Sequence, residues 1–221
     1  MVNKIKYAIF DMDGTLVDSL GYWDYFWEEF GKKYFPGQKL EKNEEIDRAI
    51  RTITMREASV LIRDRYLPGG SPEEIFELAT GMLSEHYGTR VDAKAGTREF
   101  LEYLKSRGVK MCVASATVPE YIRAALERHN LYGYFEFTIS CDEVGAGKEK
   151  PDVFLEALKR LGGRLDEACV FEDSFVALET AKKAGFMTVG IYDKNNYCQD
   201  RLAAASDFYI ADGITLMKLI Q

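Results

Sequence analysis

The stretch Phe10-Asp11-Met12-Asp13-Gly14-Thr15-Leu16-Val17-Asp18-Ser19 directly follows an apolar run that begins at Ile5. The run predicts a buried strand, and Asp11 and Asp13 stand two residues apart where that strand would leave a sheet. Ligands bind at this edge of open α/β sheets. Two carboxylates there can share a hard cation, and Gly14 allows a sharp turn beside them. Taken alone, the stretch is also explained by a strand that ends in an acidic turn.

Short apolar runs alternate with helix-period segments from residue 95 onward. This alternation is typical of an α/β fold with a parallel sheet. Counting the run before Asp11, the predicted strands span 5–10, 109–114, 136–139, 168–171 and 187–191, with a short sixth at 208–210.

Residues 18–93 interrupt this pattern, because they contain no convincing strand. They show three amphipathic segments near 19–34, 43–66 and 72–87, which indicates a helical insert. Its first segment carries an aromatic stripe, made of Leu20, Trp23, Trp27, Phe30 and Tyr34. A stripe at this spacing favours a small hydrophobic core over a ligand platform. We therefore expect an α/β core domain of residues 1–17 and 94–221, and a helical domain of residues 18–93.

The composition restricts the classes of function. The 221 residues carry a formal charge of −7, which disfavours binding to nucleic acid. No apolar run approaches the 18 residues of a membrane span, and the N-terminus lacks the pattern of a secretory signal, so we expect a cytoplasmic protein. The four cysteines lie far apart and predict neither a disulfide framework nor a zinc site. A monomer is the default expectation.

Polar residues also follow the later predicted strands. Ser115 and Thr117 follow the second strand, Lys148 lies in the loop after the third, and Glu172 and Asp173 follow the fourth. The carboxyl ends of parallel strands meet at one edge, so these groups should converge on one cleft with the two N-terminal aspartates. Hydroxyl donors, a fixed positive charge and carboxylates for a metal ion are what a phosphate group requires. Each residue singly also fits a turn, a solvated charge or a helix cap.

Four segments together resemble the motifs of the haloacid dehalogenase-like superfamily of phosphohydrolases. They occur in the order of that superfamily: Phe10-Asp11-Met12-Asp13-Gly14-Thr15-Leu16, Val113-Ala114-Ser115-Ala116-Thr117, Gly147-Lys148-Glu149-Lys150-Pro151-Asp152 and Phe171-Glu172-Asp173-Ser174. The resemblance implies a Rossmann-like parallel sheet core with a small helical cap inserted after the first strand.

By position, the resemblance also implies roles for individual residues. Asp11 would be the nucleophile that forms an aspartyl-phosphate, and Asp13 the general acid and base. The phosphoryl group would be held by Ser115, Ala116 and Lys148, with Lys148 preferred to Lys150 because it stands three residues before Pro151. The resemblance further implies Mg²⁺, bound by oxygen ligands from Asp11, Asp13, Glu172 and Asp173.

The helical insert contains an arginine cluster of Arg48, Arg51 and Arg56, near a run that resembles the substrate-contacting segment of sugar-phosphate members such as β-phosphoglucomutase. Arg56 is the best candidate for a second anion contact, although arginines on a solvated helix face fit the pattern as well.

The sequence leaves three alternative functions open. The main prediction is a phosphatase that hydrolyses a small phosphorylated metabolite. A phosphomutase of the β-phosphoglucomutase type would use the same aspartyl-phosphate and differ in the helical insert. A non-catalytic phospho-acceptor or binding module would keep Asp11 phosphorylated without turnover. A dehalogenase is disfavoured because Asp13 suits an alkoxide leaving group.

Overall fold

The computed structural model describes residues 5–50 and 55–220, and it divides the chain into two compact units. The core unit comprises the chain up to Leu20 and from Val91 onward, and the helical unit is Gly21–Arg90.

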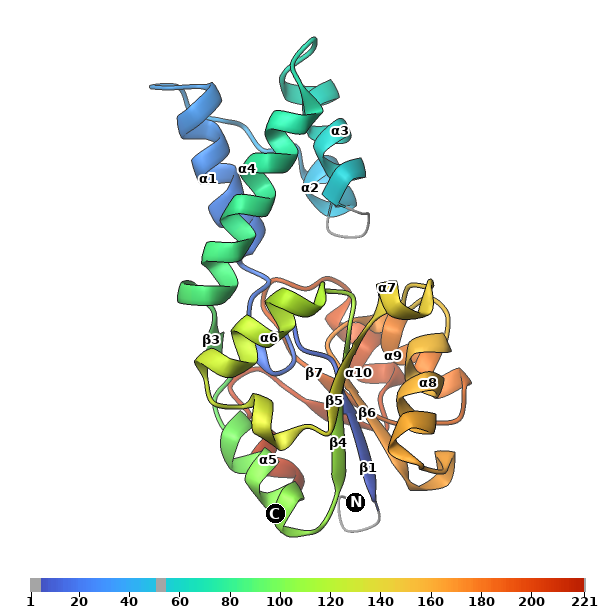
Figure 1. The fold of residues 1–221 in the computed structure, drawn as a ribbon. Coiled ribbons are helices and arrows are strands. Elements are labelled where there is room, and N and C mark those ends of the chain that lie inside the picture. The colour runs from blue at the N-terminus through green and yellow to red at the C-terminus, as the bar shows by residue number, and fades with distance from the viewer. Residues whose placement is uncertain (1–4, 51–54, 221) are drawn as a thin grey trace. The chain divides into compact units, whose positions relative to one another are not determined.

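The core unit is built on a six-stranded parallel sheet with the strand order β5-β4-β1-β6-β7-β8 (Figure 1). Its strands are β1 (Tyr7–Phe10), β4 (Lys110–Ser115), β5 (Phe137–Ser140), β6 (Ala168–Glu172), β7 (Met187–Ile191) and β8 (Phe208–Ile210). The predicted α/β fold class is therefore confirmed, and each predicted apolar run overlaps one of these strands. In the centre of the sheet, Ile9 pairs with Cys112 on one side and Val170 on the other.

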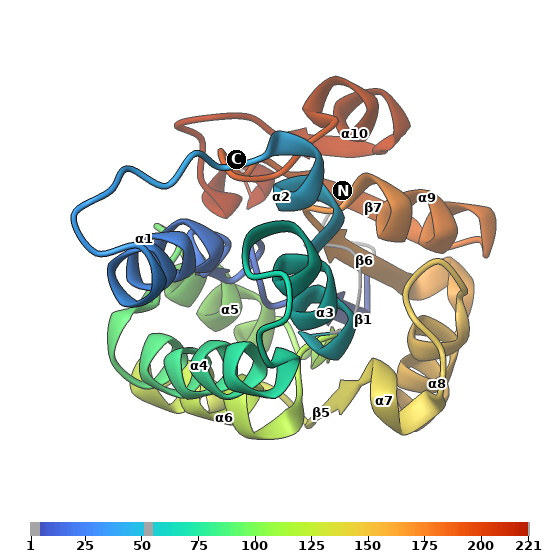
Figure 2. The ribbon, with the colours of Figure 1, turned by 90° about the horizontal axis from the view of Figure 1, so that it is seen from above.

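Helices cover both faces of this sheet. They are α5 (Thr97–Ser106), α6 (Pro119–Arg128), α7 (Cys141–Val144), α8 (Asp152–Leu161), α9 (Phe175–Lys183) and α10 (Gln199–Ala205), with short 3₁₀ turns η3 (Tyr132–Tyr134), η4 (Leu165–Glu167) and η5 (Leu216–Ile220). Helices α5 and α6 lie on one face, and α8 and α9 on the other (Figures 1 and 2). The crossovers from β1 and β6 thus run on opposite faces. In open α/β sheets, ligands bind at the carboxyl ends of two neighbouring strands that are connected in this way.

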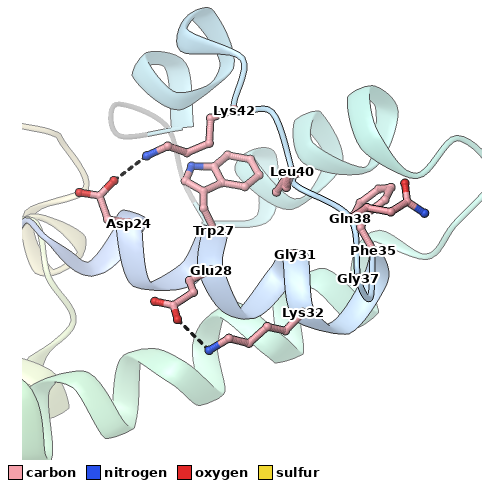
Figure 3. A pocket seen from close by; sticks show the side chains of 10 residues that line it. All are labelled: Asp24, Trp27, Glu28, Gly31, Lys32, Phe35, Gly37, Gln38, Leu40 and Lys42. Carbon is pink, nitrogen blue, oxygen red and sulfur yellow. Dashed lines mark hydrogen bonds and ion pairs between the residues drawn. The ribbon is translucent and has the colours of Figure 1, made fainter.

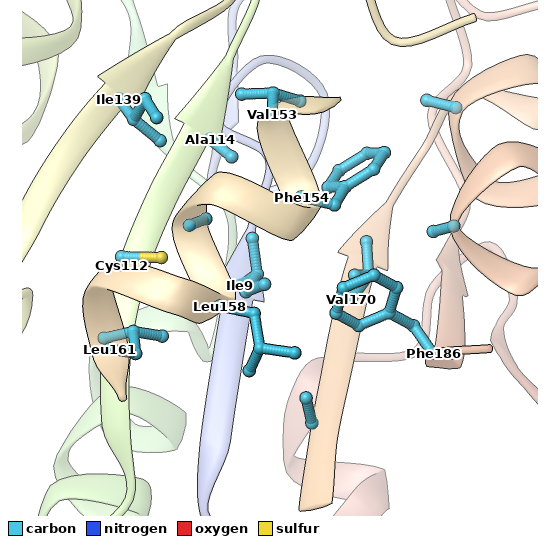
Figure 4. Packing of buried hydrophobic residues seen from close by; sticks show 14 of the residues in the cluster. Ile9, Cys112, Ala114, Ile139, Val153, Phe154, Leu158, Leu161, Val170 and Phe186 are labelled. Carbon is cyan, nitrogen blue, oxygen red and sulfur yellow. The ribbon is translucent and has the colours of Figure 1, made fainter. Parts of the chain in front are cut away.

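Helix α8 illustrates how the spacing of apolar residues makes a helix pack on the sheet (Figure 4). Its apolar side chains recur every three to four residues and are buried: Val153, Phe154, Ala157, Leu158 and Leu161. They pack on the sheet in one cluster with Ile9 and Val170. Each large apolar side chain buried in this way contributes about 1.5–3 kcal/mol, an upper value because unfolded chains are partly compact. The helix ends at Gly162, whose φ of +72° suits glycine.

The helical unit has its own hydrophobic core. Its helices are α1 (Tyr22–Tyr34), α2 (Glu44–Ile50), α3 (Met55–Tyr66) and α4 (Pro72–Glu85), followed by a π-helical turn, η2 (His86–Arg90). The aromatic stripe of α1 contributes to this hydrophobic core, as predicted. Phe30 stacks on Phe26 with their ring centroids 5.6 Å apart, and Trp27 is buried, with its indole N–H donating to Asp47 at 2.6 Å. The predicted segment 43–66 contains two helices, and the residues between them, 51–54, lie outside the described part of the chain.

A short antiparallel ribbon joins the two connections between the units. Strand β2 (Val17–Asp18) pairs with β3 (Asp92–Ala93), so the chain that leaves the core unit is bonded to the chain that returns. This ribbon was not predicted, because strands of two residues are too short to show a strand period. Among the described residues, none of the helices has the length and apolar character needed to cross a bilayer.

Candidate active site

Asp11 and Asp13 lie just beyond the carboxyl end of β1. The backbone N–H of Asp11 donates to Phe171 O at 2.9 Å, which extends the β1–β6 ladder by one residue. The chain then turns tightly, with Gly14 at φ +75° and its N–H donating to Val17 O at 2.8 Å. A left-handed φ of this kind is what the glycine supplies.

One buried lysine joins carboxylates from two neighbouring strands. Lys148, from the loop before α8, donates through Nζ to Asp11 Oδ1 and to Glu172 Oε1, the latter at 2.6 Å. All three side chains are at most 11% exposed, so water screens their charges weakly. The second oxygen of Glu172 accepts the Ser174 N–H at 3.0 Å, which fixes this carboxylate in place. The structure thus brings Lys148, the preferred lysine of its segment, to the carboxylates.

Burial and mutual charge shift the pKa values of Lys148 and of the neighbouring carboxyl groups. Burial raises the pKa of Asp11 to about 8, against the lowering effect of Lys148, and the charge of Glu172 raises it further. Burial also raises the pKa of Asp173 well above its usual range, together with the charges of Asp11 and Glu172. Burial alone would lower the pKa of Lys148, but the two carboxylates outweigh it and raise this pKa. The lysine therefore stays charged, and the acids have more negative charge than it neutralises.

This surplus of buried negative charge fits a divalent cation. Carboxylate oxygens of Asp11, Glu172 and Asp173 lie within 4.8 Å of one another, and all three residues are buried. Oxygen donors are the ligands that Mg²⁺ prefers, and a cation would return these pKa values toward their usual range. The turn after β1 is shaped around the cluster, because a Cβ on Gly14 would stand 2.3 Å from Asp173 Oδ2.

Asp13 is held by hydroxyl groups. Ser19 Oγ donates to its Oδ1 at 2.5 Å, and Thr117 Oγ1 donates to its Oδ2 at 2.7 Å. Ser115 Oγ, at the end of β4, lies 3.5 Å from the same Oδ2 and accepts the Thr117 N–H at 3.0 Å. A carboxyl group held in this way at the carboxyl edge of the sheet can exchange protons with a bound ligand.

Most of the residues singled out in the sequence therefore meet at one sheet edge. They are Asp11, Asp13, Ser115, Lys148, Glu172 and Asp173, and Ala116 follows Ser115 in an exposed position. Arg56 belongs to the helical unit, where it pairs with Glu73 at 3.3 Å and lies 4.3 Å over the ring of Phe76. Arg51 and the side chain of Arg48 lie outside the described part of the chain.

Sequence reasoning placed Thr117 at this edge without foreseeing its contact with Asp13, and it assigned no role to Ser19 or Asn196. Ser19 and Thr117 stood within or beside the quoted motifs, and their contacts with Asp13 depend on side-chain directions that spacing does not reveal. Asn196 follows β7 and donates to Asp173 Oδ2 at 2.7 Å. The rule that polar residues gather at strand ends could have found it, but no motif marks it.

The hollow beside α1 has a different character (Figure 3). Trp27, Phe35 and Leu40 line it, and its charged groups pair with one another. Lys42 binds Asp24 at 2.7 Å and Lys32 binds Glu28 at 2.8 Å. Charges satisfied in this way leave little to attract an anionic ligand, so the sheet edge is the better candidate for catalysis.

Comparison with known proteins settles the family. The model of the haloacid dehalogenase-like hydrolases matches residues 5–185, a span that includes all four of the motif-like segments identified in the sequence. The chain belongs to this family. As a member of the haloacid dehalogenase-like hydrolases, it is similar to a phosphorylated carbohydrates phosphatase of Thermotoga maritima, with 30% identity over 80% of this chain and 81% of the relative. It is 27% identical to a phosphoglycolate phosphatase of Aquifex aeolicus, over 83% of each chain.

Solved structures of the family have the same fold. A putative β-phosphoglucomutase from Thermotoga maritima superposes with a TM-score of 0.78 and 26% identity, over 93% of this chain and 94% of its own. CbbY from Rhodobacter sphaeroides, solved in complex with phosphate, gives a TM-score of 0.73 over 93% of each chain at 20% identity. This haloacid dehalogenase-like hydrolase therefore shares its architecture with proteins of nearly its own length.

Proposed function

We propose that this hydrolase is a Mg²⁺-dependent phosphatase that acts on a small phosphomonoester through a phosphorylated Asp11. One observation carries the proposal: a buried lysine bridges Asp11 and Glu172 at the edge where Asp173 supplies a third buried carboxylate. This arrangement combines a nucleophile with fixed positive charge and a set of oxygen ligands for a metal ion.

In the first step, Asp11 attacks phosphorus and the bond to the leaving alkoxide oxygen breaks. Asp13 gives its proton to that oxygen, so the product leaves as a neutral alcohol. Lys148 offsets part of the negative charge of the carboxylates, and its ammonium group would attract the anionic ester. Bound Mg²⁺, held by Asp11, the Asp13 carbonyl, Glu172 and Asp173, would neutralise charge on the phosphoryl oxygens.

In the second step, Asp13 acts as the base. It takes a proton from a water molecule, whose oxygen forms a bond to phosphorus while the bond to Asp11 breaks. Inorganic phosphate leaves, Asp11 is again a carboxylate, and Asp13 is again protonated. The hydroxyls of Ser19 and Thr117 position Asp13 for both transfers, at 2.5 and 2.7 Å. Ser115 and the exposed backbone at Ala116 would bind the phosphoryl oxygens.

The substrate class rests on the relatives. Two of them are named for the phosphatase reaction on phosphorylated carbohydrates and phosphoglycolate, which are small phosphate esters. We extend this class to the present enzyme as a small phosphorylated metabolite, with Arg56 of the helical unit as the proposed second anion contact. Cytoplasmic location and a monomeric state stay predictions from the sequence.

A phosphomutase is the second candidate, favoured by the likeness to a putative β-phosphoglucomutase. Both reactions form the same phosphorylated aspartate, and they differ in whether water or a sugar hydroxyl receives the phosphoryl group. Release of inorganic phosphate supports the phosphatase. Interconversion of two sugar phosphates with little release supports the mutase.

The proposal is tested by measuring phosphate release from sugar phosphates, phosphoglycolate, nucleoside monophosphates and an aryl phosphate, with Mg²⁺ and with a chelator. We expect release that requires Mg²⁺ and disappears in Asp11→Asn. The variant Asp142→Asn is a matched control, because Asp142 is an exposed acid of α7. A stable phosphorylated protein without turnover would indicate the non-catalytic phospho-acceptor, and substantial turnover by Asp11→Asn would contradict covalent catalysis.

A further inference from the structure

Asn196 makes two hydrogen bonds to one residue of the proposed metal site. Its side-chain nitrogen Nδ2 donates to Asp173 Oδ2 at 2.7 Å and to the backbone oxygen of the same residue at 2.8 Å. Both amide hydrogens are therefore committed to Asp173. The contact joins the loop after β7 to the residue that follows β6.

The direction of this amide is fixed by a third bond. The Asn196 Oδ1 oxygen accepts the Tyr197 N–H at 2.8 Å. An amide turned by 180° would aim its oxygen at the Asp173 carboxylate and its NH₂ group at a backbone donor, which loses all three bonds. The NH₂ group must therefore face Asp173.

The loop that carries Asn196 is itself anchored at several points. Lys94, at the return connection of the core unit, forms an ion pair with the buried Asp193 at 2.8 Å and donates to Tyr192 O at 2.9 Å. Gln199 donates to Asp193 O at 2.9 Å, and the Asn196 N–H donates to the same oxygen at 3.1 Å. These bonds hold the backbone from which the Asn196 side chain reaches the metal site.

Asp173 Oδ2 is enclosed as a result. Asn196 bonds it on one side, and the turn at Gly14 approaches so closely that a Cβ there would stand 2.3 Å away. The other oxygen, Oδ1, lies 3.5 Å from the Thr15 hydroxyl. The short bond from Asn196 thus engages Oδ2, whereas Oδ1 accepts only the long hydrogen bond from Thr15 and is the oxygen that would face a cation.

We infer that Asn196 is a positioning residue that orients Asp173 for the metal ion. This inference rests on the metal dependence of the proposed function. A group that orients a metal-binding side chain typically changes metal affinity by 10- to 100-fold when it is removed. Among the proposed metal ligands, Asn196 contacts Asp173, so its effect should be seen in metal binding before any substrate is present.

The test compares Asn196→Ala with Asn195→Ala. Asn195 is the preceding residue of the same loop, and it donates to Asp193 Oδ1 through its backbone N–H, which alanine keeps. Mg²⁺ binding is measured by calorimetry on substrate-free protein, and denaturant unfolding is measured without metal. We expect Asn196→Ala to bind Mg²⁺ about tenfold more weakly or worse. Its metal-free stability should fall, because the three hydrogen bonds of the amide are lost, but by less than the free energy of Mg²⁺ binding falls. Asn195→Ala should keep the wild-type Mg²⁺ affinity.

Two results would overturn the inference while the proposed function survives. One is a wild-type Mg²⁺ affinity in Asn196→Ala, and the other is a weaker affinity with an equally large loss of metal-free stability, which indicates a structural role. A wild-type protein that binds no Mg²⁺ would remove the proposed metal dependence and the inference with it. Should Asn196→Ala fail to fold, Gln199→Ala loosens the loop and keeps the Asn196 amide. It should weaken Mg²⁺ binding in the same direction, and unchanged binding counts against the inference.

Discussion

Gly14 lies in the turn after β1, against Asp173 of the proposed metal site. Its replacement by alanine would have two separate effects. The first is conformational: a side chain at φ +75° costs about 1–2 kcal/mol in a left-handed conformation. The second is steric. The new Cβ would stand 2.3 Å from Asp173 Oδ2 and 2.8 Å from Leu20 Cδ1, where nonbonded heavy atoms normally rest about 3.5 Å apart. Asp173 must therefore move by about 1 Å.

Gly108 provides a control for the conformational effect. It has φ +73° and follows α5 in the core unit, and a Cβ there would meet no atom within 4 Å. Gly108→Ala should therefore lose about 1–2 kcal/mol of unfolding free energy and keep its activity. Gly14→Ala should lose a similar conformational term, and its displaced Asp173 should lower kcat/KM by about 100-fold.

The assay combines urea unfolding without metal and phosphate release over a range of Mg²⁺ concentrations. We expect the activity of Gly14→Ala to require more Mg²⁺ than that of Gly108→Ala. If the two variants differ by less than about threefold in kcat/KM, the close approach to Asp173 is not the reason for glycine at this turn.

Three further predictions concern charged groups. Lys94→Ala should lower the unfolding free energy by about 3 kcal/mol in urea titrations, because the partner Asp193 is only 2% exposed and would keep an unpaired buried charge; a loss below about 1 kcal/mol would contradict this. Burial alone would raise the pKa of Asp207, but hydrogen bonds from a neighbouring lysine and threonine outweigh it and hold this pKa below 3.8. The ionised carboxylate therefore stabilises the fold above about pH 4, and this stabilisation is lost as the pH falls further. Asp207→Asn should flatten the acid limb of stability against pH, and an unchanged slope would argue against the shift. Arg56→Ala should raise KM about tenfold with kcat nearly unchanged. The control Arg63→Ala removes an arginine that pairs with the adjacent Asp64, and it should leave KM unchanged. The same KM in both variants would show that Arg56 does not contact the substrate.

The strands and the acidic turn were predictable because their signals are local. The apolar run before Asp11 is long enough to show a buried strand, and parallel strands bring their carboxyl ends to one edge whatever their order. The role of Lys148 was harder to predict because Lys150 lies two residues away. Lys148 was preferred for its spacing from Pro151. The structure places Lys148 at Asp11 and Glu172.

The contacts that sequence reasoning missed depend on tertiary placement. Asn196 reaches Asp173 across 23 residues of chain, and its loop is held by Lys94 from a distant segment. No periodicity or spacing encodes such a pair. The ribbon of β2 and β3 was missed for another reason, because each strand has two residues and its order comes from pairing rather than from propensity.

The central claim is a covalent phosphoryl group on Asp11, and trapping it is the most direct test. The enzyme is mixed with Mg²⁺ and the phosphate ester that it turns over fastest, quenched in acid during turnover and reduced with borohydride, which converts an aspartyl-phosphate to homoserine. Peptide mass spectrometry then locates the product. We predict homoserine at position 11 in the wild type and none in Asp11→Asn. Turnover with an unmodified Asp11, or modification at Asp13 instead, would contradict the account.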